Sequence, residues 1–248
     1  MQDLLKYTLR IADTSLILGQ RLSEWCSKGP TLEEDIALSN ISLDLFGQAN
    51  GLLEYASKID GSRTADDLAF KRNEREFYNL QICEQENGHF GDTMVRQFLC
   101  DTYFMLFYQE LSKSEDETLA AIANKSIKEV SYHLRHSKNW LIRLGDGTDQ
   151  SKEKVQKSIE NIWKFTGEFF EMDDLDNLMY ANKIGVNNIK LKDEWDIIVN
   201  QVLLEAKINR PEDSYMMTGS KKGLHTELLG KMLAEMQYLP RAYPDAKW

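Results

Sequence analysis

The chain has 248 residues, 42% of them hydrophobic and 28% charged, with 4 Pro and 14 Gly, a composition typical of one soluble globular domain rich in regular structure. Its net charge of −10 at pH 7 disfavours a general affinity for nucleic acid, whose phosphates need a clustered positive surface. Three cysteines without a C-x-x-C pair, a periodic N-terminus and no apolar run of ~20 residues argue against a disulfide framework, a secretion signal and a membrane span, so we expect a cytoplasmic protein.

Two helices are predicted in the first sixty residues. Residues 2–26 place apolar side chains at steps of three and four, the period of an amphipathic helix. The string Thr31-Leu-Glu-Glu34 has the form of a capping box and predicts the start of a second helix that runs to about Asp60. This second helix is apolar on nearly all sides, which indicates a buried central helix.

A long connection over 61–90 separates these helices from the next pair. It includes a short charged helix behind the capping box that begins at Thr64, and it ends in the loop "EQENGHFGD". A third long helix is predicted over 93–113. A capping box that begins at Ser114 predicts a fourth, which continues to about 145.

The remaining chain predicts three more helices and no strand. Two of them, about 151–172 and 191–209, flank the acidic segment "EMDDLDNL", and the last, about 223–239, follows the loop "TGSKKG". The expected fold class is therefore all-α. Two helices, one long crossover and two further helices are the connectivity of a ferritin-like four-helix bundle. We expect a single domain over 1–248, with a core bundle at about 2–145 and accessory helices at about 151–239 packed outside it.

Each of the four bundle helices offers one acid in step with its apolar residues. The first offers Asp13 and the third Asp101. The second offers Asp44 in a polar line at four-residue spacing, and the fourth offers Glu129 in step with a histidine. The polar residues predicted inside the bundle are Asp13, Asn40, Asp44, Gln48, Asp101, Glu129 and His133.

These acids match a ferritin-like metal centre only in part. Such a centre takes a carboxylate from each of two helices and a Glu-x-x-His pair from each of the other two, because positions i and i+3 share a helix face. Here Gly47 follows Asp44 and Tyr132 follows Glu129 at that position, and neither is a usual ligand. The only Glu-x-x-His string, which ends at His89, contains the turn sequence Asn-Gly and is discounted.

Two interpretations of the inward acids follow. The first is a buried polar network that pairs carboxylates with basic side chains, because an unpaired buried charge is too costly to keep. The second is a working bimetal centre with ligands from shifted positions, His133 and His136. The lack of a paired Glu-x-x-His favours the first, with no metal bound by this chain. Its candidate basic partners are Arg21, Arg96, Lys125 and Arg135.

A second candidate site precedes the last helix. Lys221, Lys222 and His225 lie beside a predicted helix start, whose positive end helps to hold an anion. These three residues are therefore candidate contacts for an anion or a partner. A plain helix cap next to a lysine pair explains the same string.

Long stretches of the chain resemble a known family. They are similar, in register and in the same order, to the C subunits of the ring-1,2-phenylacetyl-CoA epoxidases, also called phenylacetate-CoA oxygenases. The stretches are "IADTSLILGQRLSEWC" (11–26), "DIALSNISLDLFGQAN" (35–50), "IKEVSYHLRHSKNWLIRLGDGTD" (127–149) and "GSKKGLHTELLGKMLAEMQYLPR" (219–241). Residues of about 150–210 match less distinctly.

The resemblance implies a ferritin-like structural subunit without its own cofactor or catalytic centre. Its partner would be a homologous catalytic A subunit that holds the di-iron centre, in a complex with a B subunit and a reductase. That complex uses O2 and NADPH electrons to form the ring epoxide of phenylacetyl-CoA during aerobic phenylacetate breakdown. Nucleic acid and membranes are not expected partners, and self-association of the isolated chain stays open.

Two other functions compete with this expectation. One is a stand-alone di-metal carboxylate oxidase or oxygenase that uses the inward acids and His133 as ligands. The other is a helical module that binds an acyl-CoA through Lys221, Lys222 and His225.

Overall fold

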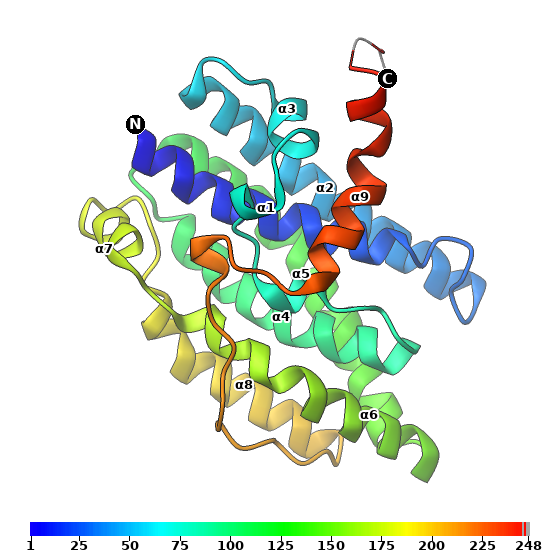
Figure 1. The fold of residues 1–248 in the computed structure, drawn as a ribbon. Helices are drawn as coiled ribbons and strands as arrows, with labels where there is room; N and C mark the ends of the chain where they lie inside the picture. Colours follow the sequence, from blue (N-terminus) through cyan, green and yellow to red (C-terminus); the bar gives the residue numbers. More distant parts are fainter. Residues whose placement is uncertain (245, 247–248) are drawn as a thin grey trace. The chain divides into compact units, whose positions relative to one another are not determined.

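The computed structural model describes residues 1–244 and 246, and within these residues the chain is helical without a strand (Figure 1). The predicted all-α class is confirmed. The α-helices are α1 (Gln2–Ser23), α2 (Leu32–Asp60), α3 (Ala65–Phe70), α4 (Phe90–Leu111), α5 (Glu117–Gly145), α6 (Asp149–Ile162), α7 (Asp174–Ala181), α8 (Lys192–Glu205) and α9 (Glu227–Ala242). Five short 3-10 helices are η1 (Glu74–Glu76), η2 (Gln81–Glu84), η3 (Trp163–Phe170), η4 (Asn188–Leu191) and η5 (Ser220–Lys222).

The chain forms two compact units. The first unit combines Met1–Glu86 with Gly219–Trp248, so it holds the first three α-helices and α9. The second unit is the continuous stretch Asn87–Thr218. The first unit is therefore built from two segments that are far apart in the sequence.

In the first unit, α1 and α2 pack side by side as an antiparallel pair (Figure 1). The Ser42 hydroxyl of α2 donates to the Gly19 carbonyl of α1 at 2.8 Å. At Gly19 a side chain would already press on Phe46, so the glycine lets the two helices approach. The Thr31 side chain caps the start of α2, and Gly61, with φ at 73°, ends it in the left-handed conformation that glycine favours.

The C-terminal helix of the first unit is fastened to the connection that follows α3. The Gln237 amide and the Arg241 guanidinium of α9 both donate to the Arg72 carbonyl, each at 2.9 Å. The turn before α9 places Gly223 directly against the Arg75 carbonyl, where a Cβ atom would collide with the backbone. The Thr226 side chain then caps α9.

In the second unit, α4 and α5 form another antiparallel pair, and α6 and α8 pack against both of them. The Phe90 and Trp140 rings meet edge to face with centroids 5.0 Å apart. The Ser158 hydroxyl of α6 donates to Asp92 of α4 at 2.5 Å. The indole N–H of Trp195, in α8, donates to the buried Leu99 carbonyl at 3.2 Å.

Several predicted boundaries need correction. The third long helix begins at Phe90 rather than at 93, because His89 and Asp92 form a capping box inside the segment expected to be a loop. The fourth begins at Glu117, and its cap is Asp116 rather than Ser114. The helix expected over 151–172 changes after Ile162 into the 3-10 helix η3, and the acidic segment contains the start of α7.

The order of elements agrees with the ferritin-like connectivity: the pair α1 and α2, a long connection, and the pair α4 and α5. Of the accessory helices, α6 and α8 belong to the second unit and α9 to the first. A single domain over 1–248, with a core bundle at about 2–145 and accessory helices at about 151–239, stays a prediction.

Candidate functional site

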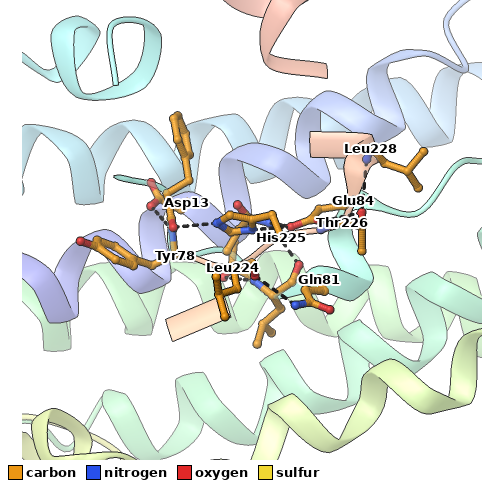
Figure 2. Close-up of polar contacts among 12 residues, drawn as sticks. Asp13, Tyr78, Gln81, Glu84, Leu224, His225, Thr226 and Leu228 are labelled. Atoms are coloured by element: carbon orange, nitrogen blue, oxygen red, sulfur yellow. Dashed lines mark hydrogen bonds and ion pairs between the residues drawn. The ribbon is translucent and has the colours of Figure 1, made fainter. Parts of the chain in front are cut away.

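The first unit contains a buried ion pair between α1 and the long connection, and Figure 2 shows its acid, Asp13, beside Tyr78. Asp13 of α1 is fully buried, and both of its carboxylate oxygens accept hydrogen bonds from the Arg72 guanidinium, Oδ2 at 3.0 Å from Nη1 and Oδ1 from Nη2. Oδ2 also accepts the backbone N–H of Tyr78 at 2.9 Å. Arg72 further donates to the Glu76 carbonyl at 2.8 Å. The Asp13 carboxylate is thus bound by a protein cation, which a metal ion would have to displace.

A second buried ion pair lies on the other side of the peptide group that joins Phe77 and Tyr78. The carbonyl oxygen of Phe77, which shares its peptide bond with the Tyr78 N–H, accepts from His225 Nε2 at 2.8 Å. The other ring nitrogen, Nδ1, lies 2.6 Å from Glu84 Oε1. We call Arg72, Asp13, the Phe77 to Tyr78 peptide, His225 and Glu84 the buried ionic network.

The Glu84 carboxylate accepts four hydrogen bonds. Besides His225, its Oε1 accepts from Asn79 Nδ2 at 2.9 Å, and its Oε2 accepts from the Thr226 backbone N–H at 2.8 Å and the Thr226 hydroxyl at 2.6 Å. Glu84 is fully buried. Charge-assisted bonds of this kind are the strong ones in proteins, so this carboxylate fastens the start of α9 to the connection.

The contacts of His225 favour its imidazolium form. A carbonyl oxygen only accepts, and the Glu84 carboxylate accepts as well, so both ring nitrogens must donate. Burial by itself would lower the pKa of His225, but the hydrogen bond and charge of Glu84, together with the Phe77 carbonyl, outweigh burial and raise it above its ordinary value. With His225 in this form, the network contains two acids and two cations whose charges balance.

The second unit contains a smaller buried polar cluster. Asp101 of α4 accepts a hydrogen bond from the Ser137 hydroxyl of α5 at 2.7 Å, and His133 of α5 is fully buried near it. Burial raises the pKa of Asp101 to about 6, although the charges of His133 and Arg96 and the Ser137 hydrogen bond act in the opposite direction. The cluster thus holds an acid that is costly to ionise.

The predicted polar line on α2 is only partly buried. Gln48 is buried and Asp44 half-buried, but Asn40 is exposed, so the prediction that Asn40 lies inside was wrong. Because α2 carries apolar residues on nearly all sides, its sequence does not show which face is turned inward.

On α2 and α5, the residue four positions after the acid is buried, whereas a Glu-x-x-His pair requires a ligand three positions after it. Gly47 and Tyr132, which follow Asp44 and Glu129 at i+3, are both exposed. The buried polar residues lie at i+4 instead: Gln48 on α2 and His133 on α5. Glu129 itself is half-buried, and its Oε1 lies 3.6 Å from Nζ of Lys125.

Most of the predicted basic partners pair elsewhere. Arg21 donates to Glu24 and to the Glu84 carbonyl, whereas the true partner of Asp13 is Arg72. Arg96 donates to Asn87 and acts on Asp101 through its charge. Arg135 lies over the Tyr132 ring, 5.6 Å from its centroid, and the Lys125 ammonium lies 3.6 Å from the carboxylate of Glu129, one of the inward acids.

The candidate anion site is altered by the burial of its histidine. The His225 side chain is fully enclosed and both of its nitrogens are engaged, so its prediction as an anion or partner contact was wrong. Lys222 is exposed and Lys221 half-buried on η5. A contact between these lysines and an anion or a partner stays a prediction.

Two functional residues could not be found from the sequence: Arg72 and Glu84. Both lie in the long connection, where neither a helical period nor a motif draws attention to them. Across residues 1–244 and 246, no group of three or more His, Cys, Asp or Glu side chains is placed to hold a metal ion, and no helix is long and apolar enough to cross a membrane.

The fold and this site define an all-α protein with ferritin-like connectivity whose buried acids pair with protein groups. The family model described as "Phenylacetic acid catabolic protein" matches residues 1–248, and the chain belongs to this family. It is 48% identical, over 248 residues, to the C subunit of the 1,2-phenylacetyl-CoA epoxidase of Escherichia coli (strain K12), covering all of both chains. The predicted resemblance is confirmed.

Proposed function

We propose that the chain is the non-catalytic C subunit of a multicomponent phenylacetyl-CoA ring epoxidase that serves aerobic phenylacetate breakdown. It pairs with a homologous di-iron A subunit and supports its fold, while a B subunit and a reductase complete the NADPH-dependent complex. The observation that carries this proposal is the 48% identity to the C subunit of such an epoxidase over the whole length of both chains.

The site chemistry supports a structural role. Asp13, the acid offered by α1, is bound by Arg72 and the Tyr78 N–H, and α2 and α5 present exposed Gly47 and Tyr132 where ligand histidines would be needed. These residues do not fit a di-metal centre, so the chain is proposed to need no cofactor of its own. Three cysteines that form no disulfide agree with a reducing cytoplasm as its location.

Reconstitution tests the pairing. The chain is co-expressed with the A subunit of the same organism, with an affinity tag on the A subunit, and the purified material is analysed by size exclusion. We expect a stable complex with equal amounts of the two chains. A chain that elutes alone under conditions in which the tagged A subunit is folded and loaded with iron would refute the proposed pairing.

Metal analysis tests the absence of a catalytic centre. The isolated chain is expressed with added iron, purified without chelator, and measured by elemental mass spectrometry. We expect less than about a tenth of an ion per chain, whereas structural and catalytic metal sites bind tightly enough to survive such purification. Close to two ions per chain would favour the stand-alone di-metal enzyme instead.

A further inference from the structure

One face of α2 leaves aliphatic side chains in water. Leu32, Ile36 and Leu43 are 73%, 52% and 64% exposed, and the exposed Asn40, Gly47 and Asn50 continue the same face at steps of three and four. We call Leu32, Ile36, Asn40, Leu43, Gly47 and Asn50 the outer stripe. Single exposed hydrophobic residues are ordinary, but an aliphatic row at this spacing is how a helix presents anchors to another helix.

The outer stripe is open to close approach at Gly47. A Cβ atom placed on Gly47 would meet no atom within 4 Å. Beside it lies a hollow of about 320 Å³ on the first unit, lined mainly by apolar side chains, among them Phe46, Leu53, Phe70 and Met236. Asn50 belongs to both the stripe and the lining of this hollow. A row of anchors next to an apolar hollow is the arrangement in which a few central side chains carry most of the binding energy.

The charges around the outer stripe define the partner. From Gly29 to Ser57 the chain has no Lys, Arg or His, and its charged residues are Glu33, Glu34, Asp35, Asp44 and Glu54. A matching surface therefore has aliphatic residues bordered by Lys or Arg, because complementary charges favour encounter and exclude wrong partners. In this chain α5 has such a basic outer face, since its exposed side chains include Lys125, Lys128, Arg135 and Arg143.

We propose that the outer stripe of α2 is the surface on which this chain receives a basic-faced helix of the homologous A subunit. The inference rests on the proposed function and adds to it the interface and the chemistry of the partner. Ile36 and Leu43 are its anchors, and the neighbouring acids align the partner helix.

A matched pair of double variants tests this interface. Ile36→Lys/Leu43→Lys places two cations on the stripe, against the basic border of the partner. Ile197→Lys/Leu204→Lys makes the same changes at two residues of α8, also seven positions apart, that are 67% and 81% exposed. Since all four positions are exposed, both variants should fold, which circular dichroism and thermal melting verify. Binding to the purified A subunit is measured by calorimetry at 50 and 300 mM salt.

We expect the α2 variant to bind the A subunit at least about 30-fold more weakly than the unchanged chain, the α8 variant to bind as the unchanged chain does, and the unchanged chain to bind more weakly at the higher salt. Unchanged binding by the α2 variant would overturn the interface and leave the proposed function standing. No binding by the unchanged chain would overturn both. An isolated chain that dimerises, and becomes monomeric in the α2 variant, would assign the stripe to a second copy and overturn the inference.

Discussion

The Nδ1 atom of His225 lies 2.6 Å from Oε1 of Glu84, although 141 positions separate the two residues in the sequence. The pair is buried, and its imidazolium also donates to the Phe77 carbonyl. Through the Phe77 to Tyr78 peptide it continues to the Asp13 and Arg72 pair, so α1, the long connection and the start of α9 share one set of charges. This relationship makes the stability of the first unit dependent on pH.

His225 should stabilise the fold most at low pH. Its pKa is raised in the folded state, so its contribution is fully present below the unfolded value of about 6.5 and is lost as pH rises through the folded value. Urea unfolding of the unchanged chain and of His225→Gln, from pH 6 to 9, should show a stability gap that narrows with rising pH. A gap that stays constant would mean that the pKa of His225 is the same in the folded and unfolded states, and would contradict the prediction. The stability difference between the unchanged chain and Glu84→Gln should also narrow with rising pH, because this substitution removes the charge that raises the pKa of His225.

Asp101 should change the stability in the same direction, although its charged form is the anion. Burial raises its pKa from 3.8 to about 6, so the folded state loses stability as pH rises through this window. The stability of Asp101→Asn relative to the unchanged chain should therefore improve by up to about 3 kcal/mol between pH 4 and 7, as 1.36 kcal/mol corresponds to one unit of pKa.

The effect of Asp101 is measured as the pH profile of the unfolding free energy. A Ser137→Ala variant tests its cause. Loss of the Ser137 hydroxyl removes a hydrogen bond that lowers the pKa of Asp101, so the midpoint of the profile should move to higher pH. A profile for Asp101→Asn that runs parallel to that of the unchanged chain would contradict the prediction.

The Asp13 and Arg72 pair should show strong coupling. Asp13→Leu leaves a buried guanidinium without its carboxylate, and we expect a loss of about 3 to 5 kcal/mol in the free energy of unfolding. The double variant Asp13→Leu/Arg72→Met removes both charges, so it should be less destabilised than the sum of the single variants by about 1 to 3 kcal/mol. Chemical denaturation of the four proteins completes the cycle. Strictly additive effects would show that the pair does not act as a unit.

Glycine positions on α5 and α2 should respond in opposite directions to the same change. At Gly145, in the second unit, a Cβ atom would collide with the Ala206 backbone carbonyl, so Gly145→Ala should cost about 1 to 3 kcal/mol. At Gly47 a Cβ atom has open space in an exposed helix interior, and Gly47→Ala should gain about 0.5 to 1 kcal/mol. Thermal melting of both variants checks the two signs. A stabilised Gly145→Ala would place α5 further from Ala206.

Local signals allowed the second helix to be predicted nearly to the residue, whereas the first, predicted over 2–26, ends at Ser23. The Thr31 cap and the glycine at position 61 lie within the stretch they delimit, so a short window of sequence contains them. The prediction of the helix over 151–172 failed after Ile162, where tertiary contacts determine the conformation of the backbone. The 3-10 helix η3 presents Phe169 to stack on Tyr103 with ring centroids 4.7 Å apart, and no local pattern marks the change from α6 to η3.

In the candidate site too, local properties could be predicted from the sequence and long-range contacts could not. That Asp13 is buried followed from the apolar spacing of α1, a property of one helix. Its partner Arg72 is 59 positions away, and the partner of His225 is 141 positions away, so neither could be predicted from spacing. On α2, where apolar residues surround the helix, even the buried face was uncertain, and Asn40 proved to be exposed.

The divided first unit also sets an order of events during synthesis. Glu84 leaves the ribosome long before His225, and the whole continuous stretch Asn87–Thr218 must be made between them. Closing so long a loop is slow, because its entropy is lost before the buried contacts can compensate for it. A nascent chain that ends before Gly219 thus has the Glu84 carboxylate without its cation and the α1 to α2 pair without α9. We expect the nascent chain to aggregate most in this interval. The segment from Gly219 onward completes the first unit and ends this exposure.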